Sequence, residues 1–311
     1  MKLIRVKISH IILLVFLLLI LMVAAIFIGT AQSSEFVIIH LRIPRIIMSV
    51  FSGATLALCG AILQSIFRNP ICDPYILGIA SGASIGAALA FILGFDFFLF
   101  GITSFALVTA FLTLLMILGI ARFSKINSPY IMLLAGISIN FFMASVLTLL
   151  MVLNHQEMQK IIFWTMGSFA TVSYYDFMFF IPVFLICTFF IFLLSKDLNI
   201  MQLGDSQAQS LGVNTKRVTH FAMLLSSILI AATVSICGVI GFIGLIIPHL
   251  VRIIWGNSAK HLFTFSIFLG AIFMLIADTI ARILISNAEL PVGSITALIG
   301  APYFIYMLVK K

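Results

Sequence analysis

The chain has 311 residues, of which 63% are apolar and only 8% are charged. No soluble globular domain approaches this composition, so we predict an all-α polytopic membrane protein with a single transmembrane domain. The net charge of +8 then indicates basic loops on the cytoplasmic side of a membrane, and not a nucleic-acid-binding surface.

About ten stretches are apolar enough to cross a membrane, which takes about 20 residues as a helix. The first stretch resembles a signal peptide, but it exceeds the usual core of ~7–15 apolar residues, so we expect it to remain as the first helix. The predicted spans are 8–29, 44–67, 75–93, 98–121, 129–153, 175–195, 218–239, 241–256, 262–285 and 291–309, with a cytoplasmic loop at 196–217.

The apolar run from Val218 to Trp255 must reverse its direction. As one helix it would be roughly 57 Å long at ~1.5 Å per residue, nearly twice the hydrocarbon thickness of about 30 Å. Gly238, Gly241 and Gly244 mark the place, because glycine permits the backbone angles and the close approach that a reversal needs. We expect close packing at Gly241, where leucine should impair folding.

A stripe of small residues at helical spacing follows the second span, so another helix's backbone can approach closely there. Its members are Gly53, Ala57, Gly60 or Ala61, and then Gln64. This span ends before Pro70 and Pro74, which interrupt the helix. Broken helix pairs at 53–86 and again at 238–248 hint at an inverted internal repeat with a transport pathway at its interface.

Basic residues orient the chain in the membrane. With the N-terminus in the cytoplasm, thirteen of the 17 lysines and arginines lie on the cytoplasmic side, as the positive-inside rule requires. An even number of spans returns the C-terminus to the same side. The cytoplasmic set is Lys2, Arg5, Lys7, Arg68, Arg122, Lys125, Lys196, Lys216, Arg217, Arg252, Lys260, Lys310 and Lys311.

Three arginines on the outer side, Arg42, Arg45 and Arg282, need compensation. Asp278 is four residues before Arg282, so a same-helix ion pair is one explanation. Arg42 and Arg45 have no obvious local acid except Glu35, and lipid headgroups could satisfy them. Alternatively, all three arginines form an outward basic patch that docks an acidic partner.

The longest polar connection contains a predicted amphipathic helix at 203–213. Its apolar positions, expected on one side, are Leu203, Ala208 and Leu211. Asp205 or Ser206 could cap the start of this helix, and Gly212 suits its end. The helix either joins two spans at the surface or docks its apolar side into a groove of a partner.

Catalytic and metal-binding patterns are missing from the sequence. The four cysteines have no CxxC spacing and are interpreted as packing residues. No Gly-Lys dipeptide occurs, so the phosphate-binding loop is missing and any ATP must be bound by another chain. We therefore predict a subunit that is not itself an enzyme, with no catalytic residue, no metal site and no bound cofactor.

A few polar residues lie at membrane depth. Those of the fifth span, Ser138, Asn140, Ser145 and Thr148, either line a pathway or bond across helices. Asp73 is interpreted as a turn residue before a proline, and Asp278 as the partner of Arg282. In an ion-coupled secondary transporter these two acids would instead be the coupling residues.

Seven stretches together resemble the FecCD-type permease subunits of ABC importers, which bring iron-siderophores, haem or cobalamin into bacteria. They are LRIPR at 41–45, GATLALCGAILQSIFRNPICDPYILGIASGASIGAALA at 53–90, LLAGISIN at 133–140, WTMGSF at 164–169, LGDSQAQSLGV at 203–213, GVIGFIGLIIPHLVR at 238–252, and ADTIAR with ELPVGSITALIGAPYFIYML at 277–308. They cover nearly the whole chain in order.

The resemblance implies a type II importer permease of ten helices in the bacterial cytoplasmic membrane. It further implies a second permease subunit, identical or paralogous, two ATP-binding subunits, and an extracytoplasmic substrate-binding protein. ATPase coupling would fall on Leu203, Gly204, Asp205, Ala208, Leu211 and Gly212, binding-protein docking on Arg42, Arg45 and Arg282, and the pathway near Ser138, Asn140, Ser145, Ser294 and Thr296. The expected cargo is an iron-siderophore, with haem or cobalamin as alternatives.

Overall fold

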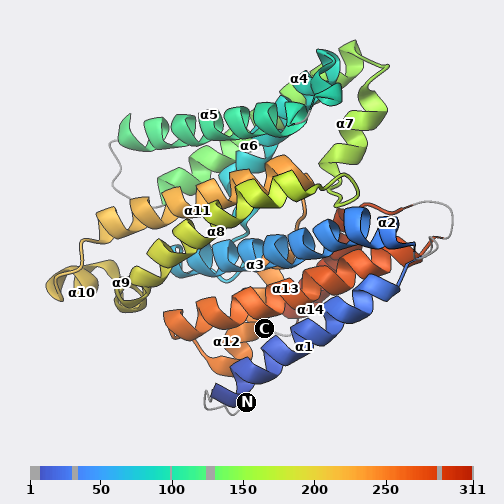
Figure 1. The fold of residues 1–311 in the computed structure, drawn as a ribbon. Helices are drawn as coiled ribbons and strands as arrows, with labels where there is room; N and C mark the ends of the chain where they lie inside the picture. Colours follow the sequence, from blue (N-terminus) through green and yellow to red (C-terminus); the bar gives the residue numbers. More distant parts are fainter. Residues whose placement is uncertain (1–7, 30–33, 99, 124–129, 286–288, 310–311) are drawn as a thin grey trace.

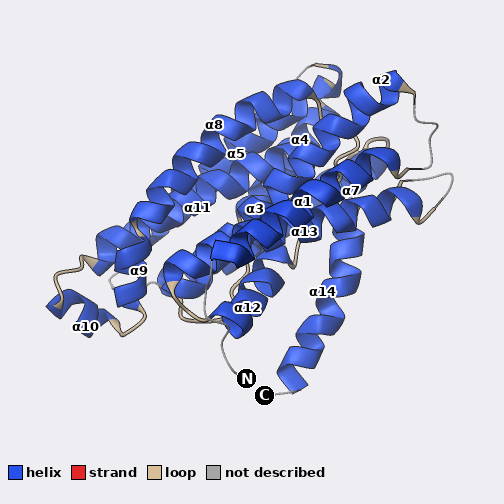
Figure 2. Ribbon diagram, turned by 60° about the horizontal axis from the view of Figure 1, so that its bottom comes forward, coloured by secondary structure: helices blue, strands red, loops and turns tan. Residues whose placement is uncertain are grey.

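The computed structural model describes residues 8–29, 34–98, 100–123, 130–285 and 289–309, and every regular element within them is a helix (Figures 1 and 2). The helices are α1 (Ile8–Phe27), α2 (Glu35–Val37), η1 (Ile38–Arg42), α3 (Ile43–Ile66), η2 (Pro74–Leu77), α4 (Ile79–Ile92), η3 (Phe95–Phe97), α5 (Gly101–Phe123), α6 (Tyr130–Leu153), α7 (Met158–Thr165), α8 (Tyr174–Leu193), α9 (Ser195–Met201), α10 (Asp205–Ser210), α11 (Thr215–Cys237), α12 (Ile243–Trp255), α13 (Ala259–Ile283) and α14 (Val292–Val309).

Each of the ten predicted spans contains one apolar helix. Seven helices in the described part are long and apolar enough to cross a membrane: α1, the continuous stretch from α2 through α3, α5, α6, α8, α11 and α13. Three apolar helices are shorter, namely α4, α12 and α14. The predicted boundary at residue 129 lies outside the described residues, as do Lys2, Arg5, Lys7, Lys125, Lys310 and Lys311.

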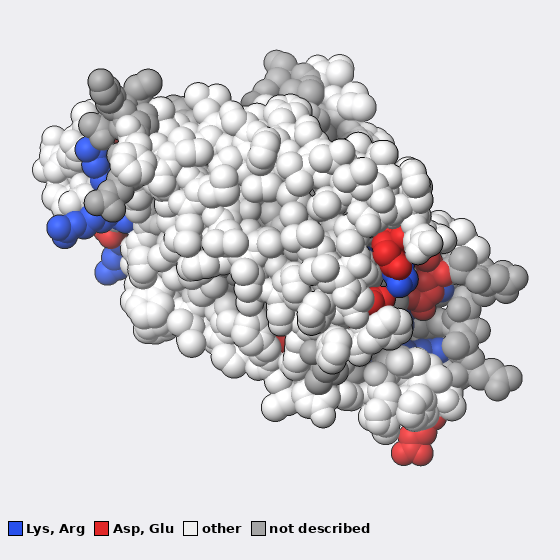
Figure 3. Space-filling view, turned by 90° about the horizontal axis from the view of Figure 1, so that it is seen from above, with Lys and Arg blue, Asp and Glu red and all other residues white. Residues whose placement is uncertain are grey.

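Charged side chains gather at the two ends of the bundle, and the face in Figure 3 is largely free of them in between. One end carries α9 and α10, and the opposite end carries α2 and α7 (Figure 1). A broad uncharged band between two charged ends matches a hydrocarbon layer between two aqueous faces.

Helix α3 is the centre of the bundle, and twenty of its 24 residues are buried. It packs against α13, α12, α11 and α8. A Cβ atom at Gly53 would collide with the carbonyl oxygen of Gly270 on α13, and one at Gly60 would collide with the backbone of Gly244 on α12. Ala57 also contacts Gly270, which confirms the predicted small-residue stripe as a surface where helix backbones touch.

The chain reverses between α11 and α12, but not with the packing we expected. Gly238 adopts a φ of 70°, and a Cβ there would meet the carbonyl oxygen of Trp164. Gly244 lies against Pro74. Gly241, in contrast, has no atom within 4 Å of a Cβ built on it, so the expectation of close packing at Gly241 is wrong.

The two predicted breaks in the helices contact each other in the middle of the bundle. The amide of Ile240, between α11 and α12, donates a hydrogen bond of 2.9 Å to the hydroxyl of Tyr75 in η2. Asp73 caps η2 by accepting a hydrogen bond from the amide of Tyr75 at 2.8 Å, so its interpretation as a turn residue is confirmed. An inverted repeat relating the two halves stays a prediction.

The contact between α3 and α12 gives a first test. We expect Gly60→Val to lower the melting temperature of the detergent-purified protein, because overpacking costs about 1–3 kcal/mol even where a side chain can shift, and here backbone blocks it. The control is Gly119→Val in α5, where nothing lies within 4 Å and the change in helix propensity is the same. Equal melting of the two variants would contradict the close contact.

Candidate functional site

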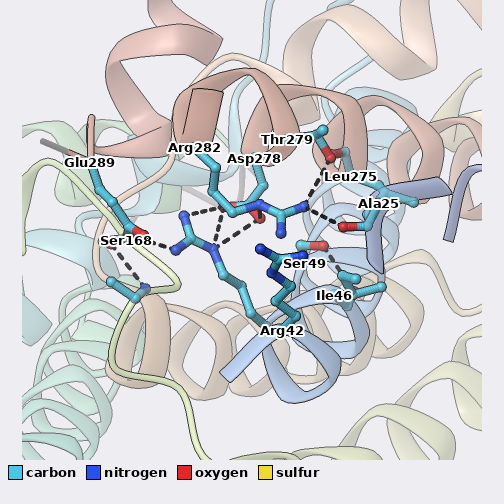
Figure 4. A network of polar contacts seen from close by, with 12 residues as sticks. Ala25, Arg42, Ile46, Ser49, Ser168, Leu275, Asp278, Thr279, Arg282 and Glu289 are labelled. Atoms are coloured by element: carbon cyan, nitrogen blue, oxygen red, sulfur yellow. Dashed lines mark hydrogen bonds and ion pairs between the residues drawn. The ribbon is translucent and has the colours of Figure 1, made fainter. Parts of the chain in front are cut away.

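An ionic cluster joins the start of α3 to the last turns of α13 (Figure 4). Nε of Arg45 donates to both carboxylate oxygens of Asp278, at 3.0 and 3.1 Å, and its Nη2 donates to Oδ1 at 2.9 Å. Nη1 of the same guanidinium donates to Glu289 at 2.6 Å. Such multiple, charge-assisted contacts fix the geometry of an arginine as well as its charge.

The two other arginines tie α1 to this cluster. Arg282 lies 3.5 Å from Asp278, which confirms the predicted same-helix pair. It also donates to the carbonyl oxygen of Ala25 at 3.3 Å, and Arg42 donates to that of Ile26 at 2.7 Å. Both carbonyls belong to the last turn of α1, where helix carbonyls lack intrahelical partners and a positive charge is favourable.

The side chains of this cluster correct the picture of an exposed basic patch. Arg42, Arg45 and Arg282 are only 5%, 6% and 5% exposed, and the carboxylate of Asp278, which pairs with Arg45 and Arg282, is fully buried. Nη1 of Arg282 is buried without a hydrogen-bond partner. Only the side chain of Glu289 is half exposed, at 50%, so any partner at this surface meets the carboxylate of Glu289 before it meets a guanidinium.

A cavity of about 620 Å³ opens beside the cluster and is partly lined by Glu289. Trp164 and Asp176 also line it. Lys160, another of its lining residues, bridges Asp96 and Glu157 at 2.9 Å each, and these two carboxylates raise the pKa of Lys160. The few charged side chains that line the cavity are therefore mostly acidic, and they are already paired or used as caps.

The predicted pathway residues on α6 divide into two groups. Ser138 and Ser145 lie on an exposed stripe, seven residues apart, with Phe141 between them. The amide oxygen of Asn140 accepts a hydrogen bond from the hydroxyl of Ser81 on α4, so Asn140 bonds across helices. Thr148 is exposed, and its hydroxyl donates a hydrogen bond to the carbonyl oxygen of Ala144 in the same helix.

On α14 the structure separates the two candidate pathway residues. Ser294 is half-buried. Thr296 is completely buried, and its hydroxyl donates to the carbonyl oxygen of Gly293 at 3.0 Å. Thr296 faces the interior of this chain, so the expectation that it lines a pathway is wrong for the chain on its own.

Helix α10 is shorter than predicted and has a different cap. Gly204, with a φ of 123°, is the N-cap residue of α10. The side chains of Asp205 and Ser206 do not cap this helix. Asp205 instead forms an ion pair with Arg68 at the end of α3. Gly212, with a φ of 85°, follows the helix as predicted, because glycine tolerates the left-handed conformation.

The three apolar positions of this loop do not share a side. Ala208 is completely buried, whereas Leu203 and Leu211 are each 62% exposed. Leu203 precedes α10 and Leu211 is its C-cap residue, so Ala208 holds α10 against the bundle while the two leucines flank the helix in solvent. These exposed leucines are the docking candidates that the structure retains.

In the described part of the chain, no group of three or more His, Cys, Asp or Glu side chains is placed to hold a metal ion. The four cysteines are free and buried.

Long and short apolar helices, with charge confined to the two ends, define a polytopic α-helical membrane protein. The FecCD transport family model matches residues 3–310, and the chain belongs to this family. It is 37% identical to the molybdate import permease MolB of Haemophilus influenzae over 88% of this chain and 81% of that protein. It is 36% identical to the hemin permease HmuU of Yersinia pestis over 88% and 83%.

The fold is shared with a solved structure described as an inward-facing, metal-chelate type ABC transporter. The TM-score is 0.90 at 35% sequence identity, and the alignment covers 98% of this chain and 100% of that chain. The arrangement of ten apolar helices is thus that of an ABC importer permease of the type II class.

The cluster gives a second test. Asp278→Asn should destabilise the protein by about 3–5 kcal/mol, because removing one member of a buried ion pair leaves an uncompensated charge. The matched control, Glu289→Gln, removes a half-exposed carboxylate from the same guanidinium and should cost about 0–1 kcal/mol. Thermal and denaturant unfolding in detergent measure both; a smaller effect for Asp278→Asn would show that the cluster does not depend on this carboxylate.

Proposed function

We propose that this chain is a permease subunit of an ATP-driven importer that carries a metal chelate, an iron-siderophore in the first place, across the bacterial cytoplasmic membrane. The supporting observation is the match to the FecCD family over residues 3–310, together with the shared fold of a metal-chelate type transporter. Haem and cobalamin remain the alternative cargoes, and the relatives named for hemin and for molybdate widen the range of candidates.

The proposed importer contains a second permease subunit, two ATP-binding subunits and an extracytoplasmic binding protein. The exposed stripe of α6 supports the second permease, because polar side chains such as Ser138 and Ser145 suit a protein or water interface better than lipid, although the hydroxyl of Ser145 also donates to the carbonyl oxygen of Phe141. In the proposed orientation, both termini and α10 are cytoplasmic, and the cluster of Arg42, Arg45 and Arg282 is at the outer face.

The proposed docking element for the ATP-binding subunits is α10 with its flanking leucines. Leu203 and Leu211 are exposed on either side of a helix whose Ala208 is anchored in the bundle. Two exposed apolar side chains that flank a short, fixed helix can enter a groove of a partner. The pairing of Asp205 with Arg68 connects this element to α3, so a displacement of α10 acts on the central helix.

Reconstituted uptake tests the proposal. Proteoliposomes that contain the permease, the ATP-binding subunits and the binding protein should accumulate an iron chelate only with ATP. Replacing both Leu203 and Leu211 with alanine should weaken co-purification of the ATP-binding subunits and lower uptake at least tenfold, with an unchanged melting temperature.

Uptake that persists without the ATP-binding subunits would instead favour the ion-coupled transporter. That alternative uses Asp73 and Asp278 as coupling acids, whereas Asp278 is already paired with Arg45 and Arg282 and Asp73 caps η2. Lys216→Ala and Arg217→Ala, two exposed changes near α10, serve as controls for effects of surface substitution on co-purification.

A separate prediction concerns docking of the binding protein at the outer face. A carboxylate of the partner has to compete with Glu289 for Nη1 of Arg45. Glu289→Gln should therefore tighten docking several-fold, most clearly at low salt, since exposed charges are screened over about 8–10 Å at physiological ionic strength. Surface plasmon resonance with immobilised permease measures this, and Glu35→Gln is the control; weaker docking of Glu289→Gln would rule out competition for Arg45.

A further inference from the structure

Arg252, in the last turn of α12, is a half-buried guanidinium without a carboxylate partner. Its Nη1 donates to the side-chain oxygen of Asn257 at 3.2 Å and its Nη2 to the hydroxyl of Ser65 at 3.3 Å. Its Nε is buried and has no partner. All nine acidic residues of the sequence lie within the described residues, and none of them forms an ion pair with Arg252.

This guanidinium faces a pocket of about 280 Å³ at the α10 end of the bundle. The end of α3 supplies Gln64, Ser65 and Arg68, the end of α9 supplies Gln202, and Arg252 and Asn257 complete the wall. None of the described residues that line the pocket is acidic. The pocket therefore brings two guanidinium groups together, and only Arg68 has a counter-charge, from Asp205 outside the pocket wall.

A buried or partly buried charge is costly unless it is paired. Neutral acceptors such as those of Ser65 and Asn257 satisfy hydrogen bonds of Arg252 but leave its charge uncompensated. The opposite end of the bundle shows the contrast, because there Arg45 and Arg282 share the buried carboxylate of Asp278. The pocket at Arg252 is therefore arranged to receive an anion.

Gln64 restricts the kind of anion that fits. It is 1% exposed, and its amide nitrogen is engaged by the carbonyl oxygens of Gly244 and Leu245 at 3.1 and 3.3 Å. Its amide oxygen is buried and has no partner, so it can accept a hydrogen bond. Inorganic phosphate retains a protonated oxygen near neutral pH, and a phosphate monoester does so in its monoanionic form, below a second pKa of about 6, whereas sulfate has none.

We propose that the pocket between Arg68 and Arg252 binds a phosphate group that carries a protonated oxygen. Its source is either free phosphate or a phosphomonoester in the cytoplasm, or the headgroup of phosphatidic acid. Arginine recognises phosphate through parallel hydrogen bonds, and the amide oxygen of Gln64 accepts a hydrogen bond from the remaining P–OH group. The bound anion competes with Asp205 for Arg68 and so alters how α10 is held.

Ligand-dependent melting of the full-length protein tests this site. Inorganic phosphate should raise the melting temperature in detergent, because a ligand of the folded state stabilises it by mass action. Sulfate at equal ionic strength should require at least tenfold higher concentration for the same shift. In Trp164→Phe, the remaining tryptophan, Trp255, stacks on Phe265 at 4.3 Å one turn from Arg252, and its fluorescence should titrate with phosphate.

Variants and lipids assign the effect to the pocket and to a source. Arg252→Gln should shift the phosphate dependence at least tenfold, whereas Arg217→Gln, an exposed arginine at the same end, should leave it unchanged. Nanodiscs of phosphatidylcholine with and without phosphatidic acid test the lipid source: protection by phosphatidic acid alone supports the headgroup, and protection by free phosphate supports the soluble ligand.

The proposal would be overturned if sulfate raised the melting temperature as effectively as phosphate, or if Arg217→Gln shifted the phosphate dependence as much as Arg252→Gln. It would also be overturned if neither phosphate nor phosphatidic acid raised the melting temperature. If neither ligand protects the isolated chain but Arg252→Gln loses the ATP-binding subunits, the partner of Arg252 is an acidic side chain of another protein. That result would also exclude the phosphate site.

Discussion

Direct backbone contact between α3 and its neighbours α13 and α12 determines where everything else lies. Gly53 and Gly270 meet where α3 and α13 cross. Arg45 is eight residues before Gly53, and Asp278 is eight residues after Gly270. Because the helices run in opposite directions, equal spacings of about 12 Å at ~1.5 Å per residue bring Arg45 and Asp278 to the same level, where they form the buried ion pair.

The two ends of the bundle handle positive charge in opposite ways. At the α2 end, Asp278 and Glu289 pair with Arg45 and Arg282 inside the chain. Most of the positive charge at this end is therefore compensated without a partner protein. At the α10 end, Arg252 has only neutral acceptors. One end can thus exchange one carboxylate for another, whereas the other end requires an additional anion.

The sequence predicted contacts that depend on local spacing and missed those that depend on distant residues. Helical periodicity predicted the stripe of Gly53, Ala57 and Gly60, and a spacing of four residues predicted the Asp278–Arg282 pair. The pairing of Arg45 with Asp278 spans 233 residues and leaves no local signal. Likewise, nothing in the run Gly238–Gly244 distinguishes the glycines that touch another backbone from Gly241, which does not.

Helix α3 also has an ion pair to another helix at or near each of its ends. Its 24 residues extend about 36 Å at ~1.5 Å per residue. At one end Arg45 forms an ion pair with Asp278 of α13. Just beyond the other end Arg68 forms an ion pair with Asp205 of α10. Rigid elements transmit displacement better than loops. The two ion pairs thus provide a direct connection from α10 along α3 to the far face, which does not pass through α9 and α11, the neighbours of α10 in the sequence.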